Sequence, residues 1–87
     1  MTAGHIYIIT DGANTKIGIT TDFDKRMASY KTHNATAQPF KNYQCDIEEA
    51  KRIETVIKAA FKYAQVGKGK EWFAVEAETI DRYVSTL

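Results

Sequence analysis

The feature of this sequence that most constrains its fold is a pair of short apolar runs near the amino terminus. The runs cover His5 to Thr10 and Thr15 to Thr20, and the four residues Asp11-Gly12-Ala13-Asn14 separate them. Runs of β-branched residues divided by residues that favour turns are typical of a β-hairpin. The sequence therefore predicts two antiparallel strands at the start of the chain.

The predicted hairpin brings several polar groups to one face. Side chains alternate along a strand, so if Thr10 and Thr15 flank the turn, Tyr7 lies opposite Gly18 and diagonal to Lys16. This register places a phenol, an ammonium group and a bare stretch of backbone together. Gly18 has two open interpretations: a bulge or poorly packed strand position, or a gap that lets a ligand approach the sheet.

A helix is expected after the hairpin, over about residues 23–33. Thr21 or Asp22 can cap its amino terminus. At a helical period, Arg26 and His33 lie together along one edge of the apolar stripe. An arginine at such a margin is usually a surface residue with a buried stem, so its position alone does not indicate catalysis. The apolar stripe itself consists of Phe23, Met27 and Tyr30.

The middle of the chain predicts a third strand and a long second helix. The strand covers Phe40 to Cys45, and the helix follows Asp46 and continues to about Ala64. Asp46 and Glu49 have the spacing of a capping box, in which each side chain bonds the other's backbone N–H. One arc of the helix is apolar, and it is formed by Ala50, Ile53, Ile57, Ala60, Phe61 and Ala64.

Glu54 breaks the apolar pattern of this second helix. On a helical wheel it lies within about 20° of Phe61. Burial of an unpaired carboxylate is costly, so Glu54 should have a cation, a hydrogen-bond donor or a metal ion beside it. Two interpretations stay open: a metal ligand, or a peripheral ion pair with Lys58 at i+4 or Lys51 at i−3.

The last third of the chain predicts a loop, a strand and a short helix. Val66 to Lys70 form a basic loop that contains two glycines, and Glu71 to Val75 form the strand with its aromatic pair in the core. A helix from about Ala77 to Val84 then closes the fold, with Ile80 facing inward. The expected fold class is α/β (α+β), with a small central antiparallel or mixed sheet of three to four strands flanked by helices.

Length and composition limit what such a chain can be. Its 87 residues suit one compact domain, which we expect to cover residues 1–87. The net charge of +1 neither favours nor excludes a nucleic-acid partner. A single cysteine and two histidines provide neither an internal disulfide nor a Cys/His zinc cluster. Without a long apolar segment or a secretory signal, we expect a cytoplasmic protein that does not enter membranes.

In order and spacing, the sequence resembles the GIY-YIG endonuclease superfamily, most closely its small phage and bacterial branch. Gly4-His5-Ile6-Tyr7 stands where the family has its GIY motif, and Lys16-Ile17-Gly18 stands in place of YIG. Asp22-Phe23-Asp24-Lys25-Arg26 resembles the helix start that ends in the family's catalytic arginine. Glu54 lies where a metal-binding glutamate is expected, and Glu71-Trp72-Phe73 looks like the closing motif of this branch.

The resemblance implies hydrolysis of DNA phosphodiester bonds assisted by one Mg²⁺ or Mn²⁺ ion. It implies that Tyr7 is the general base and that Arg26 stabilises the phosphate. A Lys16 ammonium group beside Tyr7 would stabilise the phenolate form and lower the pKa of the phenol. Glu54 would bind the metal ion. Further candidates are Tyr30 as a catalytic residue, and Gly18 and His33 as substrate-binding residues.

The partner implied by the resemblance is DNA, with a homodimer or a protein partner supplying specificity. The basic residues Lys25, Lys31, Lys68 and Lys70 are candidates for contacts with the phosphate backbone, although each is also typical of a solvated surface. Lys16 replaces the tyrosine of the second motif. A catalytically inactive module that binds nucleic acid or protein on the same scaffold therefore stays an alternative.

Overall fold

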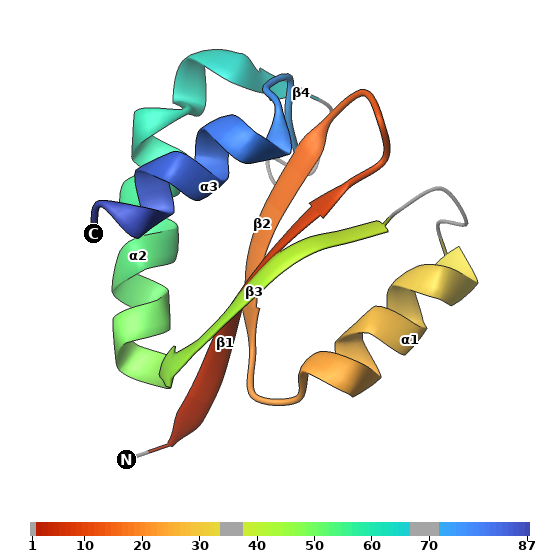
Figure 1. The fold of residues 1–87 in the computed structure, drawn as a ribbon, viewed down its shortest axis with the longest axis vertical. Helices are drawn as coiled ribbons and strands as arrows, with labels where there is room; N and C mark the ends of the chain where they lie inside the picture. Colours follow the sequence, from red (N-terminus) through yellow and green to blue (C-terminus); the bar gives the residue numbers. More distant parts are fainter. Residues whose placement is uncertain (1, 34–37, 67–71) are drawn as a thin grey trace.

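A five-stranded antiparallel sheet with the spatial order β3-β1-β2-β5-β4 forms the centre of the molecule (Figure 1). The structure is a computed structural model that describes residues 2–33, 38–66 and 72–87, without the side chains of residues 30–33. The strands are β1 (Ala3–Thr10), β2 (Thr15–Thr20), β3 (Gln38–Asp46), β4 (Gln65–Val66) and β5 (Trp72–Phe73).

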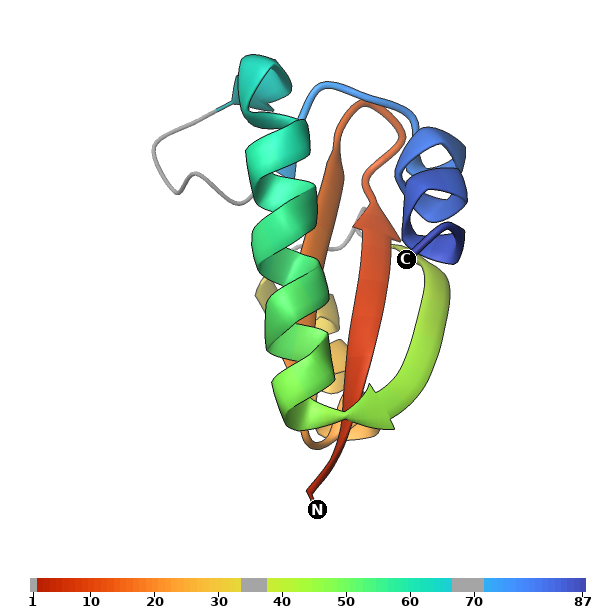
Figure 2. The same ribbon diagram turned by 90° about the vertical axis from the view of Figure 1, so that its left-hand side faces the viewer.

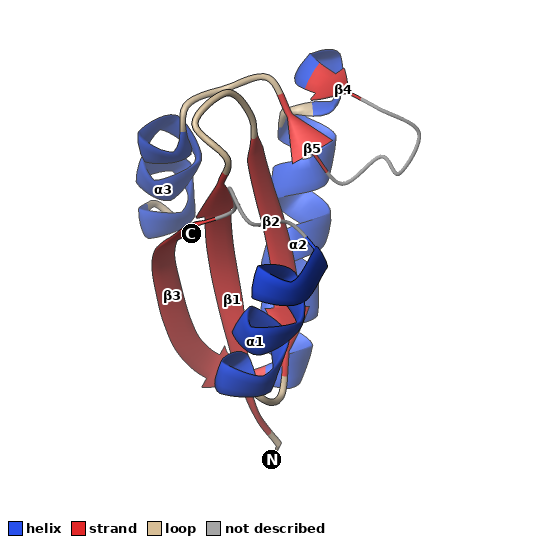
Figure 3. Ribbon diagram, turned by 90° about the vertical axis from the view of Figure 1, so that its right-hand side faces the viewer, coloured by secondary structure: helices blue, strands red, loops and turns tan. Residues whose placement is uncertain are grey.

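The helices cover both faces of this sheet. They are α1 (Phe23–His33), α2 (Ile47–Ala60) and α3 (Ala77–Ser85), with the short 3-10 helix η1 (Lys62–Ala64) after α2. Figure 2 looks onto the face that α2 and α3 share, and Figure 3 shows α1 in front of β1 and β2 with α2 behind them. The predicted fold class is confirmed, and the sheet contains one more short strand than expected.

The predicted hairpin is confirmed in its register. Thr10 pairs with Thr15, and Tyr7 pairs with Gly18. The Asp11 carboxylate fixes the turn because one of its oxygens accepts hydrogen bonds from the backbone N–H groups of Ala13, at 2.9 Å, and Asn14, at 2.7 Å. Gly12 has a φ of 94°, which side chains rarely adopt, so the turn needs glycine there.

Most of the apolar core lies between the sheet and the pair α2 and α3. Strand side chains Ile6, Ile8 and Ile17 alternate with the residues of the other face and pack against both helices. The helices contribute the predicted stripes, with Ile57 and Ile80 both fully buried. On this side of the sheet, the two helices and Phe61, which directly follows α2, add these buried residues to the core: Ala50, Ile53, Ile57, Phe61, Ala77, Ile80 and Val84.

Several local predictions differ from the structure. The capping box does not form: Asp46 is the N-cap residue of α2, but its side chain makes no cap hydrogen bond. Glu49 forms an ion pair with Arg52 instead, because the guanidinium one turn ahead offers a charged donor. The long helix ends at Ala60 and continues as η1 rather than as one helix to Ala64.

The strands after the hairpin also differ in extent. β3 begins at Gln38 and ends at Asp46, so it is longer than predicted. The last strand is shorter, since β5 contains Trp72 and Phe73 alone among the described residues. Phe73 is buried as predicted, and Trp72 is half-buried. Residues 67–71, which include most of the predicted basic loop and Glu71, lie outside the described residues.

The described helices are all too short or too polar to cross a lipid bilayer.

Candidate functional site

Tyr7 and Gly18 form the centre of the candidate site. They are direct partners across β1 and β2, and the Tyr7 side chain is 2% exposed. A Cβ atom added to Gly18 would overlap the hydroxyl and Cζ atoms of Tyr7. The phenol ring therefore extends from β1 over the backbone of β2, and its hydroxyl rests on Gly18. On its other side the ring packs with Ile9 and the half-buried Phe23 and Met27.

The structure gives Gly18 a role that neither sequence interpretation anticipated. The pairing of β1 with β2 is continuous through this residue, so Gly18 is not a bulge. The space that its missing side chain leaves is filled by Tyr7 and is not open to a ligand directly above it. The glycine is needed because any side chain there would displace the phenol.

Gly18, on which the Tyr7 hydroxyl rests, lies in a part of β2 that has a described partner strand on one side only. Within the described residues, β5 pairs with Thr15 and Lys16, and no described strand pairs with residues 17–20 on the side away from β1. We call this segment the outer edge of β2.

Lys16 lies on the same face as Tyr7, as the hairpin register predicted. It is half-buried and pairs directly with Ile9, which is two residues from Tyr7 and packs with it. The ammonium side chain thus belongs to the face of the sheet that α1 covers. The diagonal relation of Lys16 and Tyr7 is therefore confirmed, and its effect on the phenol stays a prediction.

Arg26 lies on α1 at the rim of a surface hollow of about 490 Å³. The helix begins where predicted because the Asp22 carboxylate accepts a hydrogen bond of 3.1 Å from the Lys25 backbone N–H, so Asp22 is its cap. Arg26 is exposed, as expected for the margin of the core. We call this feature the α1 hollow, and its lining consists of Thr20, Thr21, Asp22, Lys25, Arg26 and Ser29.

Glu54 lies on α2, which covers the opposite face of the sheet from α1. Its carboxylate is 3.6 Å from Nζ of Lys58, and the two side chains are 21% and 30% exposed. The predicted ion pair at i+4 is therefore present, whereas Lys51 pairs with Glu48. No three His, Cys, Asp or Glu side chains of the described residues gather closely enough to hold a metal ion together.

The structure thus brings some of the predicted site residues together and separates others. Tyr7, Lys16 and Gly18 share the face of the sheet on which α1 places Arg26. Glu54 belongs to the other face, so a site common to all of them would extend around the outer edge of β2. The side chains of the two remaining candidates, Tyr30 and His33, lie outside the described residues.

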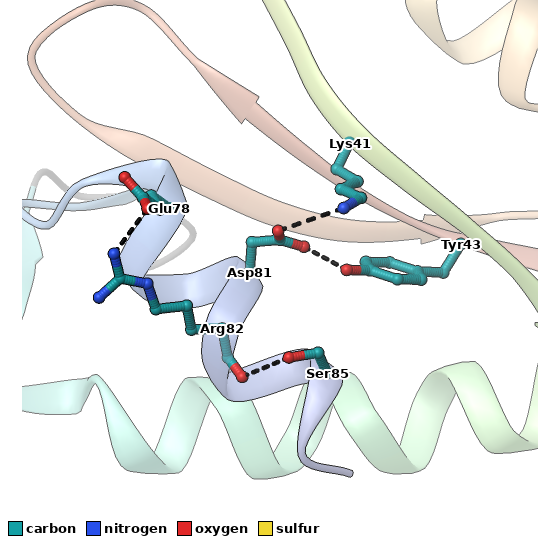
Figure 4. Close-up of polar contacts among 6 residues, drawn as sticks. All are labelled: Lys41, Tyr43, Glu78, Asp81, Arg82 and Ser85. Carbon is teal, nitrogen blue, oxygen red and sulfur yellow. Dashed lines mark hydrogen bonds and ion pairs between the residues drawn. The ribbon is translucent and has the colours of Figure 1, made fainter.

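A polar cluster that the sequence did not predict joins β3 to α3 (Figure 4). Tyr43 donates a short hydrogen bond to the Asp81 carboxylate, and Nζ of Lys41 lies 3.5 Å from the same group. Burial, followed by this hydrogen bond, raises the pKa of Tyr43. The negative charge of Asp81 raises the pKa of Lys41. Strand alternation places Lys41 and Tyr43 on one face, but no local signal identifies Asp81 as their partner.

The fold is consistent with a small nuclease-like α+β domain. The family comparison is more specific: the chain belongs to the T5orf172 domain family, which matches residues 4–87. That domain is linked to phage proteins of the GIY-YIG-like nuclease type, and it associates this chain with a nuclease-related or DNA-binding role. No curated protein and no solved structure gives a significant match to the chain.

Proposed function

We propose that this chain is a metal-dependent endonuclease that hydrolyses DNA phosphodiester bonds. The observation that carries the proposal is the Tyr7 hydroxyl resting on Gly18, beside the outer edge of β2, on the face where α1 presents Arg26. Membership of a nuclease-linked domain family supports it. The GIY-YIG resemblance of the hairpin motifs gives the proposal its particular chemistry.

In this proposal Tyr7 accepts a proton from the attacking water. An ordinary tyrosine has a pKa of about 10, which is too high for a base at neutral pH. A cation on the same face favours the phenolate form and lowers the pKa, and Lys16 is placed to act in this way. Arg26 would hold the non-bridging phosphate oxygens through its planar set of N–H donors.

Glu54 is the residue that would hold the metal ion. Mg²⁺ often binds through one or two carboxylates and takes its other ligands from water and substrate phosphates, so a single glutamate fits this manner of binding. Lys58 competes for the same carboxylate, and the ion pair would have to open. When bound, the ion would supply positive charge at the reacting phosphate.

A second candidate function is a module that binds DNA without cutting it. Two observations favour it: the Tyr7 side chain is 2% exposed, and the Glu54 carboxylate is occupied by Lys58. A base must reach its water, and a metal ligand must be free of its cation. Under either function, a particular DNA structure, a second copy of the chain or a protein partner would supply target choice.

Nicking of supercoiled plasmid in the presence of Mg²⁺ or Mn²⁺ tests the endonuclease proposal. We expect the purified protein to nick, and the variants Tyr7→Phe, Arg26→Ala and Glu54→Ala each to lose about a hundredfold or more of the rate. Glu49→Ala is the matched control for Glu54→Ala, because Glu49 is an exposed carboxylate of the same helix paired with Arg52. It should nick at the wild-type rate.

Two results would contradict the endonuclease proposal. If the wild-type protein leaves the plasmid intact with both metals but binds it in a salt-sensitive manner, the binding module is the correct function. If no salt-sensitive DNA binding occurs, both nucleic-acid functions are wrong, because phosphate contacts release counterions and weaken as salt rises. A protein-interaction module on the same scaffold would then be the remaining function.

A further inference from the structure

The cationic side chains of this protein fall into two groups. Most of those in the described residues already have a carboxylate partner. Lys25, Arg26 and Lys62 differ: within residues 2–33, 38–66 and 72–87, none of these three side chains makes an ion pair or a hydrogen bond. Of the three, Lys25 and Arg26 are neighbours on α1. The pairs formed by the first group are Lys41–Asp81, Lys51–Glu48, Arg52–Glu49, Lys58–Glu54 and Arg82–Glu78.

The two unpaired cations of α1 lie in a concave place. Both line the α1 hollow, whose volume of about 490 Å³ is within the usual range of ligand pockets, about 300–1,000 Å³. Three hydroxyl groups also line it. The Thr20 hydroxyl is engaged locally, because it accepts the Asp22 N–H and donates to the Asp22 carbonyl oxygen, each at 3.1 Å. Thr21 and Ser29 are exposed, so their hydroxyls remain available as donors.

Asp22 limits where an anion can bind in the α1 hollow. Its carboxylate accepts the Lys25 backbone N–H and so occupies the amino terminus of α1, where an anion would otherwise bind. A phosphate must therefore lie against the Lys25 and Ser29 side chains rather than at the helix end. The negative charge of Asp22 also opposes such a phosphate, so it weakens binding relative to two cations alone.

We propose that the α1 hollow is a second phosphate subsite for DNA, next to the phosphate that Arg26 holds. Lys25 provides the charge, and the hydroxyl of Ser29, one turn further along α1, donates a hydrogen bond to a backbone phosphate of the bound strand. This proposal rests on the proposed function, because it assumes that DNA is the partner. It adds a positioning role for two side chains outside the proposed catalytic group.

The salt dependence of DNA binding tests the role of Lys25. Binding of a labelled duplex oligonucleotide is measured by fluorescence anisotropy in EDTA, so that binding is observed without cleavage. We expect Lys25→Ala to reduce the slope of log K against log[salt] by about 0.9, the value for one lost phosphate contact. Lys62→Ala is the matched control: this exposed lysine has no ion pair within the described residues, and it should leave the slope unchanged.

The variant Asp22→Asn tests the α1 hollow in the opposite direction, because it should increase the affinity for DNA. Asparagine caps helices about as well as aspartate, so α1 should keep its start while the hollow loses a negative charge. We expect DNA to bind about two- to tenfold more tightly at low salt, with the gain declining as salt screens the charge. Circular dichroism of the variant should match the wild type.

The outcomes separate this proposal from the endonuclease proposal. If Lys25→Ala and Lys62→Ala change the slope equally, or Asp22→Asn does not tighten binding, the subsite is wrong even when the wild type nicks plasmid. If the slope and affinity results hold but no nicking occurs, the subsite is supported and the endonuclease is wrong. If a mononucleotide binds as tightly as the duplex through Lys25, the hollow recognises a small phosphate ester and the DNA subsite is wrong.

Discussion

The face of the sheet under α2 and α3 and the face under α1 are built differently. The first buries a continuous cluster of strand and helix side chains, including Ile57 and Phe73, both fully buried. The second buries Tyr7 and Ile9, with α1 packed on them through half-buried side chains. Since apolar burial stabilises a fold by about 25 cal/mol per Å², most of the stability must come from the first face.

The helices on the two faces also differ in whether their cations are paired with carboxylates. On α2 and α3 the cations form ion pairs within a turn of their own helix, as with Arg52 and Glu49. On α1 the neighbouring Lys25 and Arg26 lack such partners within the described residues. The comparison indicates that the first face carries most of the fold's stability, whereas the neighbouring Lys25 and Arg26 on α1 have no carboxylate partner among the described residues.

The largest expected change in stability tests whether the face under α2 and α3 contributes more to the fold than the face under α1. Ile57→Ala, on the α2 side, should lower the free energy of unfolding by about 2–5 kcal/mol, because it leaves a cavity in a fully packed core. Met27→Ala, on the α1 side, should cost less than about 2 kcal/mol, because Met27 is only half-buried and the site can relax. Urea denaturation followed by circular dichroism measures both. Equal losses would show that the two faces contribute equally to stability.

The next largest loss of stability is expected where Tyr7 of β1 contacts Gly18 of β2 on the α1 face. Gly18→Ala should lower the free energy of unfolding by about 1–3 kcal/mol, because the new methyl group overlaps the Tyr7 ring. The same substitution in a Tyr7→Leu background should cost clearly less, since a shorter side chain leaves room. A double-mutant cycle by chemical denaturation measures this coupling. A cost that does not depend on residue 7 would mean that strand propensity, not the phenol, requires glycine.

A smaller effect is expected where α3 is joined to β3. Tyr43→Phe removes the hydrogen bond to Asp81 and should cost about 1 kcal/mol. The pKa of Tyr43 is raised in the folded state, so its contribution is complete below its ordinary value of 10.0 and is lost as the pH rises through the folded-state value. Unfolding measured at several alkaline pH values should show the wild type converging on Tyr43→Phe. A constant difference would contradict this linkage.

The smallest effect is expected at the hairpin turn. The pKa of Asp11 is lowered by hydrogen bonds from the backbone of Asn14 and Ala13. A lowered folded-state pKa contributes stability above the ordinary value of 3.8, and this contribution is lost as the pH falls through the folded-state value. Asp11→Ala should therefore be slightly less stable than the wild type at neutral pH and equal to it in acid. Thermal unfolding between neutral and acidic pH measures the difference, and a gap that persists in acid would contradict the assignment.

Local sequence patterns predicted the hairpin register, the start of α1 and the inward face of α3, because nearby residues determine them. The cap of α2 was not predictable in this way. Asp46 and Glu49 had the correct spacing, but Arg52 offered Glu49 a charged partner that the pattern ignores. The bond from Tyr43 to Asp81 joins elements far apart in the chain, so only the tertiary fold reveals it.

The candidate site was predicted only in those features that nearby residues determine. The pairing of Tyr7 with Gly18 follows from the turn, so the sequence indicated it correctly. The sequence did not indicate that the phenol would fill the space above the glycine, which depends on a side-chain rotamer. It also left both interpretations of Glu54 open, because helical periodicity does not choose between Lys58 and a metal ion.

The contact of the Tyr7 hydroxyl with bare backbone has a consequence for insertions in the hairpin. The hydroxyl rests on Gly18 because the turn between Thr10 and Thr15 has a fixed length. A register slip of one residue moves every side chain of a strand to the opposite face. One extra residue in the turn would put Ile17 or Ile19 opposite Tyr7 in place of the glycine. The length of a surface turn therefore determines whether the phenol has room to lie where it does.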